Sequence, residues 1–168
     1  IQPRVASATY YELDYRHYTR LTARYTWANR FIFAGLLSRQ LYHYTPLWVG
    51  GPDDLRGYDY GEFSGYHIGV WNTELRYPFI DNLKIAFPLP LYLRNIRGGV
   101  FVDMGFATND LRKLNLYEDG RLKDLKLGFG TGVRMNLGYF VLQVTCAWHT
   151  DLVNYSAPYW YVSFNPEF

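Results

Sequence analysis

The feature that most constrains the fold is a strict alternation of residue types in "LKLGFGTGVRMNLG", residues 125–138. The odd positions, from Leu125 to Leu137, are apolar apart from one threonine, and the even positions are lysine, glycine, arginine or asparagine. Because successive side chains of a strand point to opposite faces, this pattern predicts a strand with one apolar face. A membrane-spanning strand needs about 9–11 residues, whereas a typical soluble strand has about 5–6. The segment is therefore long enough to span a membrane.

The same alternation recurs along the chain and predicts seven antiparallel strands, starting near residues 6, 21, 66, 98, 125, 139 and 158. The connections at 39–65 and 107–124 are long and polar, and most others are short, which is typical of outer-membrane barrels. We expect one face of the strands to be apolar and to meet lipid. The expected lipid-facing residues are Leu127, Phe129, Val133, Met135, Leu142, Val144, Cys146 and Trp148.

A soluble sandwich is the main alternative to a transmembrane barrel. In a sandwich the even positions of 125–138 would face water, where Gly128, Gly130 and Gly132 would only weaken a strand. In a barrel these glycines line the lumen, which tolerates them. Aromatic residues make up 20% of the chain, with 17 Tyr and 5 Trp, and such residues suit membrane interfaces. The sequence therefore favours an all-β transmembrane antiparallel barrel.

The segment 80–96 is long and apolar, but it lies on the side of the predicted barrel where the other connections are short turns. Pro88 and Pro90 argue against a spanning strand there, since proline cannot donate a ladder hydrogen bond. A complete eight-stranded barrel, with residues 83–93 as its eighth strand, is a further alternative that these prolines disfavour.

Several classes of function are disfavoured by composition. The net charge of +2 and the scattered basic residues do not indicate nucleic-acid binding. A single cysteine excludes an internal disulfide and a cysteine-based zinc site. The four histidines lack metal-ligand spacing, and no phosphate-binding loop or serine-nucleophile motif occurs. We therefore expect no cofactor, no metal and no enzymatic activity.

Three motifs follow one another in the chain: "LRGY" at 55–58, "NTELRYPF" at 72–79 and "GVFVDMG" at 99–105. Because it has these three motifs in this order, the chain resembles the BamA-type outer-membrane assembly and secretion barrels, also called the bacterial surface antigen family. The resemblance implies an arginine loop tucked inside the barrel, here the motif loop at about 39–65. It also implies sixteen strands, so residues 1–168 would be the C-terminal portion of the barrel, with the remaining strands elsewhere.

The resemblance and the alternation together suggest where Arg56 goes. Strand parity places Glu74 and Asp103 on the lumen face, and we expect Arg56 to pair with both. A planar guanidinium suits two acids at once and stays ionised. Gly57 would permit close backbone approach, and Tyr58 would pack on the inner wall. The alternative is an exposed arginine in a solvated loop. The lumen motif is thus predicted to comprise Arg56, Gly57, Tyr58, Glu74, Asp103 and Gly105.

The resemblance implies an integral protein in the outer membrane of a Gram-negative-type bacterium, one that assembles, inserts or translocates other polypeptides through a lateral gate or the lumen. A client strand would add to the terminal strand at 158–168, a form of β-augmentation. The implied partners are outer-membrane lipid, the remaining strands, client polypeptides and accessory lipoproteins. The alternative is a passive pore, or a barrel anchoring a fused periplasmic or surface domain. The gate residues would be Trp160, Val162, Phe164 and Phe168.

Overall fold

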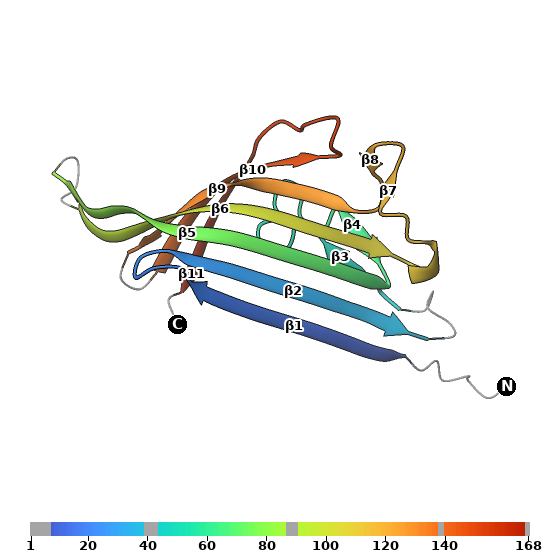
Figure 1. Cartoon of the computed structure of the whole chain (residues 1–168). Coiled ribbons are helices and arrows are strands. Elements are labelled where there is room, and N and C mark those ends of the chain that lie inside the picture. The colour runs from blue at the N-terminus through green and yellow to red at the C-terminus, as the bar shows by residue number, and fades with distance from the viewer. Residues whose placement is uncertain (1–7, 39–43, 87–90, 138–139, 167–168) are drawn as a thin grey trace.

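The computed structural model describes residues 8–38, 44–86, 91–137 and 140–166, and its main feature is one sheet of seven antiparallel strands (Figure 1). Each strand pairs with the next in the order β1-β2-β5-β6-β9-β10-β11. The all-antiparallel prediction is therefore confirmed. The sheet does not close on itself, and β1 and β11 are its edges. The strands are β1 (Thr9–Arg20), β2 (Thr26–Leu37), β5 (His67–Ile85), β6 (Leu91–Thr108), β9 (Lys126–Asn136), β10 (Phe140–Thr150) and β11 (Tyr159–Pro166).

The first two strands begin later than the alternation predicts, at Thr9 and Thr26. Residues 21–25 form a tight turn, in which the Leu21 N–H donates to the Tyr25 carbonyl at 3.1 Å. An apolar–polar alternation continues through this turn, so the pattern alone could not show where β2 begins.

The start predicted near residue 98 is wrong, because β6 begins at Leu91. Residues 80–85 continue β5, and they pair with 91–96 of β6 from Ile80 opposite Ile96 onward. The two strands thus form a hairpin that projects past the first residue of β2, which pairs with Arg76 (Figure 1). No separate eighth strand forms at 83–93, whose described ends belong to β5 and β6. Pro88 and Pro90 lie outside the described residues.

The two faces of the sheet differ as the alternation predicts. Leu142 and Val144 of β10 lie opposite Met135 and Val133 of β9, and the Trp148 ring stacks on Phe129 with centroids 6.1 Å apart. This outer face continues onto β11, where Trp160, Val162 and Phe164 are exposed. The other face, the inner face, carries the motif loop (Figure 1).

The described part of the motif loop forms its own small hairpin against the inner face. Its strands β3 (Leu47–Val49) and β4 (Phe63–Gly65) pair with each other and enclose residues 50–62. Leu55 and Tyr58 from the loop pack with Ile32 of β2 and Val70 of β5, together with Val49. Leu55 is fully buried, and full burial of a leucine contributes about 1.5–3 kcal/mol. This cluster fixes the loop to the wall.

The connection between β6 and β9 holds a 3₁₀ turn (Leu111–Lys113) and a short hairpin of β7 (Tyr117–Glu118) and β8 (Arg121–Leu122). Among the described residues, no helix is both long and apolar enough to cross a membrane.

Cys146 lies on the outer face of β10, opposite Trp160 of β11 and Thr131 of β9, and is 8% exposed. We expect a water-borne maleimide to leave Cys146 unlabelled in intact membranes and to label it after denaturation. In a Cys146→Ala background, Ser163→Cys on the inner face of β11 is the matched control and should be labelled in the native state. Rapid labelling of Cys146 itself in intact membranes would contradict its placement on the outer face.

Candidate functional site: an arginine held inside the sheet

The motif loop turns sharply just before Arg56. Gly50 and Gly51 have φ of +132° and +104°, a region that only glycine adopts readily. The Gly51 N–H then donates to the Leu55 carbonyl at 3.1 Å and closes the turn. With Leu55 buried in the apolar cluster, the next side chain, Arg56, points at the inner wall of the sheet.

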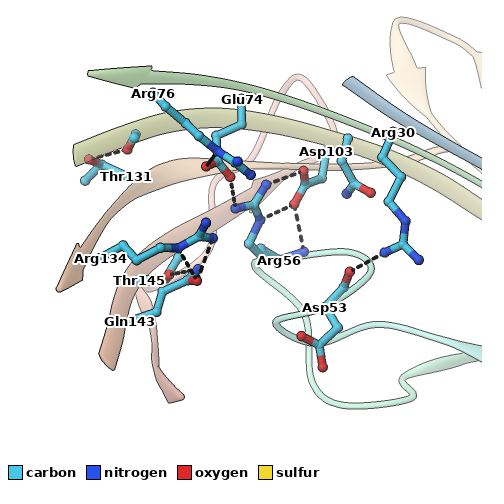
Figure 2. Close-up of polar contacts among 12 residues, drawn as sticks. Arg30, Asp53, Arg56, Glu74, Arg76, Asp103, Thr131, Arg134, Gln143 and Thr145 are labelled. Atoms are coloured by element: carbon cyan, nitrogen blue, oxygen red, sulfur yellow. Dashed lines mark hydrogen bonds and ion pairs between the residues drawn. The ribbon is translucent and has the colours of Figure 1, made fainter. Parts of the chain in front are cut away.

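Arg56 meets two carboxylates from neighbouring strands (Figure 2). Its Nε donates to Asp103 Oδ2 at 2.7 Å, and its Nη2 donates to Asp103 Oδ1 at 2.8 Å. Its Nη1 donates to Glu74 Oε2 at 2.9 Å, and its backbone N–H donates to Asp103 Oδ2 at 3.2 Å. Three guanidinium nitrogens thus serve two acids, and the contact with Asp103 is bidentate.

The pair formed by Arg56 and Asp103 is withdrawn from solvent. Arg56 is 7% exposed and Asp103 is fully buried. The guanidinium carbon lies 3.4 Å from the centroid of the Phe101 ring, a cation–π contact. Burial alone would lower the pKa of Arg56, but the hydrogen bonds and charges of Asp103 and Glu74 outweigh it and raise that pKa. Arg56 therefore remains charged in this setting.

The two acids differ in how strongly they depend on Arg56. Glu74 also accepts a hydrogen bond from Arg76, whose Nε lies 2.8 Å from Glu74 Oε1. Asp103 has no other cation within ion-pair distance among the described residues. Loss of Arg56 would consequently leave Asp103 buried without a cation, while Glu74 would keep Arg76.

Gly57 joins the loop to the last two strands of the sheet. Its φ is +98°, and a Cβ there would lie 2.7 Å from the Trp148 carbonyl oxygen. Its N–H donates to the Tyr161 hydroxyl at 2.9 Å, and its carbonyl lies 2.6 Å from His149 Nδ1. The Tyr161 hydroxyl in turn donates to the Tyr58 carbonyl at 2.8 Å. The motif loop is therefore attached to β10 and β11 as well as to β5 and β6.

Tyr58 packs on the inner wall. Its ring stacks on His149 with centroids 4.4 Å apart and meets Phe63 edge-on. Its hydroxyl accepts from the Leu127 N–H at 3.2 Å and lies 3.4 Å from the Leu127 carbonyl, to which it donates. Burial raises the pKa of Tyr58 to about 12, so the hydroxyl stays neutral and can fill both roles.

One glycine of the sheet, Gly128, allows the loop to lie this close. A Cβ at Gly128 of β9 would overlap the backbone carbonyl oxygen of Arg56. A Cβ at Gly105 of β6 would lie 3.2 Å from the Gly69 carbonyl oxygen, a tight contact within the sheet, and 3.5 Å from Leu55 Cδ1 of the loop, an ordinary contact. The close approach of the loop therefore requires glycine at position 128, but it does not require glycine at position 105.

Comparison with known protein families identifies the family of this chain. The sequence matches the Omp85 superfamily domain over residues 4–165. The chain belongs to the Omp85 superfamily. No curated protein matches the chain. Omp85 proteins are outer-membrane proteins of Gram-negative-type bacteria or organelles, and they insert or transport other proteins.

In this Omp85 domain the predicted site residues fall into two groups. Within the lumen motif, Glu74 and Asp103 bind Arg56, and Gly57 and Tyr58 follow it in the loop. Gly105 lies next to Leu55 instead. The terminal-strand set does not join the lumen motif: Trp160, Val162 and Phe164 lie on the outer face and are 68%, 62% and 66% exposed. Phe168 lies outside the described residues.

Five residues of this Omp85 site were not among those predicted from the sequence. Strand parity places all of them on the inner face, so the alternation contained a signal. Parity does not say which inner-face residues meet, because that depends on register and on how deep the loop sits. The five are Arg76, Phe101, Gly128, His149 and Tyr161.

Side chains of β2 and β5 also hold the loop through the backbone carbonyls of Asp53 and Asp54. Arg30 of β2 donates to the Asp53 carbonyl at 3.3 Å, and Asn72 of β5 donates to the Asp54 carbonyl at 2.6 Å. The described residues include no group of three or more His, Cys, Asp or Glu side chains that could hold a metal ion. At the centre of this Omp85 site is a buried cation, Arg56, held between the acids Glu74 and Asp103.

Proposed function

We propose that this chain is the C-terminal portion of a sixteen-stranded BamA-type barrel in a bacterial outer membrane. The barrel would assemble, insert or translocate other polypeptides through a lateral gate or the lumen. The seven-stranded sheet requires further strands, because each unsatisfied backbone group in hydrocarbon costs several kcal/mol. The exposed apolar and aromatic outer face is the surface that lipid would cover.

The observation that carries this proposal is the link between the motif loop and β11. Tyr161 of β11 binds both Gly57 and Tyr58 through its hydroxyl. The opposite edge of β11 pairs with no strand in the described sheet. An unpaired edge is a template for strand addition, and the loop would hold that edge in position while a client strand pairs with it.

Crosslinking in intact membranes tests this role. A photoreactive residue at Val162 or Ser163 of β11, in the full-length protein, should crosslink to outer-membrane barrel precursors stalled during insertion. The same residue at Val102, in the central strand β6, is the control and should not. Depletion of the protein should lower the outer-membrane content of barrel proteins. A passive pore or barrel anchor would give no precursor crosslinks and would leave that content unchanged.

We expect Tyr161→Phe to loosen β11 without releasing Arg56. The change removes the acceptor of the Gly57 N–H and the donor to the Tyr58 carbonyl, and an unsatisfied buried backbone group costs about 1–3 kcal/mol. Hydrogen exchange of residues 159–166 should become faster. Tyr159→Phe is the matched control, since the Tyr159 hydroxyl makes no hydrogen bond to the described residues. Equal exchange in both variants would show that the hydroxyl does not hold the strand.

A further inference from the structure

Two arginines lie directly opposite each other on neighbouring strands. Arg97 of β6 and Arg134 of β9 are Cα partners in the sheet, and both side chains line one cavity on the inner face. Like charges placed opposite each other destabilise a sheet. Two opposed arginines are therefore expected where a negatively charged group neutralises them.

The side chains around this cavity do not supply that neutralisation. Four arginines line it, Arg56, Arg76, Arg97 and Arg134, together with one carboxylate, Glu74. Glu74 is already bonded to Arg56 and to Arg76. Within the part of the chain that the structure describes, neither Arg97 nor Arg134 forms an ion pair.

Arg134 is instead held by neutral groups (Figure 2). Its Nε and Nη2 donate to Gln143 Oε1 at 3.2 and 2.8 Å. The Gln143 amide nitrogen donates to Thr145 Oγ1 at 3.2 Å, which leaves the hydroxyl hydrogen of Thr145 available to donate. These contacts orient the guanidinium of Arg134 but leave its charge uncompensated.

The cavity has room for a small ligand. Its volume is about 70 Å³, and a single water needs about 10–15 Å³ on the same measure. Gly99 and Gly132 keep this space open: added Cβ atoms would lie 3.3 Å from Glu74 Oε1 and 3.0 Å from Thr145 Oγ1. Several waters or one small oxyanion would fit.

We propose that Arg97 and Arg134, with Arg76 and the Thr145 hydroxyl, form a lumenal binding site for a phosphate group. Guanidinium forks match the geometry of phosphate oxygens and bind them through charge-assisted hydrogen bonds. The bound anion would neutralise the opposed pair. The site lies beside the Arg56 ion pairs but does not use Asp103, and it stands whether or not the barrel inserts other proteins.

Titration calorimetry on the full-length protein in detergent tests this site. Inorganic phosphate is added at constant ionic strength, with sodium chloride as the compensating salt. We expect saturable binding at one site, weakened about tenfold or more by Arg134→Gln or by Arg97→Gln, because each removes a charged donor group. Glycerol 3-phosphate serves as a second titrant, and tighter binding of it would identify a lipid headgroup as the source of the phosphate.

The matched control is Arg16→Gln on the inner face of β1. It removes the same charge, but Arg16 is already paired with Asp14 at 2.8 Å. We expect this variant to bind phosphate like the wild type. An equal loss of affinity in Arg16→Gln would show that the lumen attracts anions only through its total charge, and would overturn the site.

The midpoint of thermal unfolding gives a second, independent test, because the proposal predicts the direction in which it changes. Without phosphate, Arg134→Gln should leave the unfolding midpoint unchanged or raise it, because the opposed charges are relieved. Phosphate should raise the midpoint of the wild type and not that of Arg134→Gln, since a ligand stabilises only the state that binds it. A lower midpoint for Arg134→Gln in both buffers would show that Arg134 is held by a carboxylate or serves only to hold Gln143. Either that result or the absence of phosphate binding overturns the proposal.

Discussion

Replacement of Arg56 by alanine should release the motif loop from the inner wall and destabilise the barrel by about 3–5 kcal/mol, the usual cost of removing one member of a buried ion pair. The reason is the burial of Asp103, which is fully enclosed and bonded to two guanidinium nitrogens of Arg56. The variant also loses the contact between the guanidinium and the Phe101 ring. Arg56→Lys should rescue poorly, because one ammonium group cannot replace three separate nitrogens.

The two acids should respond unequally. Asp103→Asn should resemble Arg56→Ala, and combining the two should cost much less than the sum, as expected for residues in direct contact. Glu74→Gln should release Arg56 less than Asp103→Asn does, since Asp103 still holds the Arg56 side chain. Glu74→Gln also leaves Arg76 without its acid. Strict additivity of Arg56→Ala and Asp103→Asn would contradict the pairing.

Urea unfolding of the full-length protein in lipid vesicles measures the free-energy change, and limited proteolysis at residues 50–65 reports loop release. Arg30→Ala is the matched control. Arg30 also touches the motif loop, through the Asp53 carbonyl, but its side chain is 30% exposed and its ion pair with Asp14 is open to water. Such exposed pairs contribute about 0–1 kcal/mol. If the two arginine variants destabilise equally and leave the loop equally protected, Arg56 does not hold it.

The strands were predictable because a transmembrane strand must alternate along its whole length. In β9 and β10 the alternation runs through the entire element, and the predicted starts at 125 and 139 lie next to Lys126 and Phe140. Where one side is lipid and the other lumen, a single-residue slip would turn every side chain to the wrong face. That constraint appears directly in the sequence.

The projecting hairpin of β5 and β6 could not be predicted in the same way. Beyond Arg76 the edge of β5 has no β2 residue beside it, so the constraint that keeps apolar and polar residues in alternation is weaker there. The register also shifts between Pro78 and Ile80. In the sequence, Pro88 and Pro90 suggested a break, although the strand that precedes them is continuous up to Ile85.

At the site, the sequence identified the motif residues and the two acids of Arg56, but not the residues of other strands that Arg56 and Gly57 contact. Arg56, Glu74 and Asp103 were found because their motifs and parity point inward. Tyr161 and His149 have the same parity but meet Gly57 from strands more than 90 residues later in the chain. Nothing in local patterning specifies such contacts, which depend on the depth at which the loop lies inside the sheet.

The clearest consequence of that depth concerns Gly128. Gly128→Ala should expel the motif loop about as completely as Arg56→Ala, although it adds only one methyl group. The added Cβ would overlap the carbonyl oxygen of Arg56, a backbone atom that cannot rotate away as the end of a flexible side chain can. Either the strand and loop separate locally, at the cost of about 1–3 kcal/mol typical of overpacking, or the loop leaves and the ion pairs of Arg56 are lost with it.

These two outcomes can be told apart by combining the variants. If the loop is expelled, Gly128→Ala in the Arg56→Ala background should add little, because the clash has already been relieved. The matched control is Gly132→Ala, on the same strand and face. The three atoms nearest to its new Cβ all belong to β10, and they include the rotatable hydroxyl of Thr145 at 3.0 Å and the Val144 carbonyl oxygen at 3.3 Å. This control should leave residues 50–65 protected from protease. A Gly128→Ala protein with a protected loop and wild-type urea stability would mean that the loop lies farther from β9 than the structure places it, and the close seating of Arg56 against Asp103 would then be wrong.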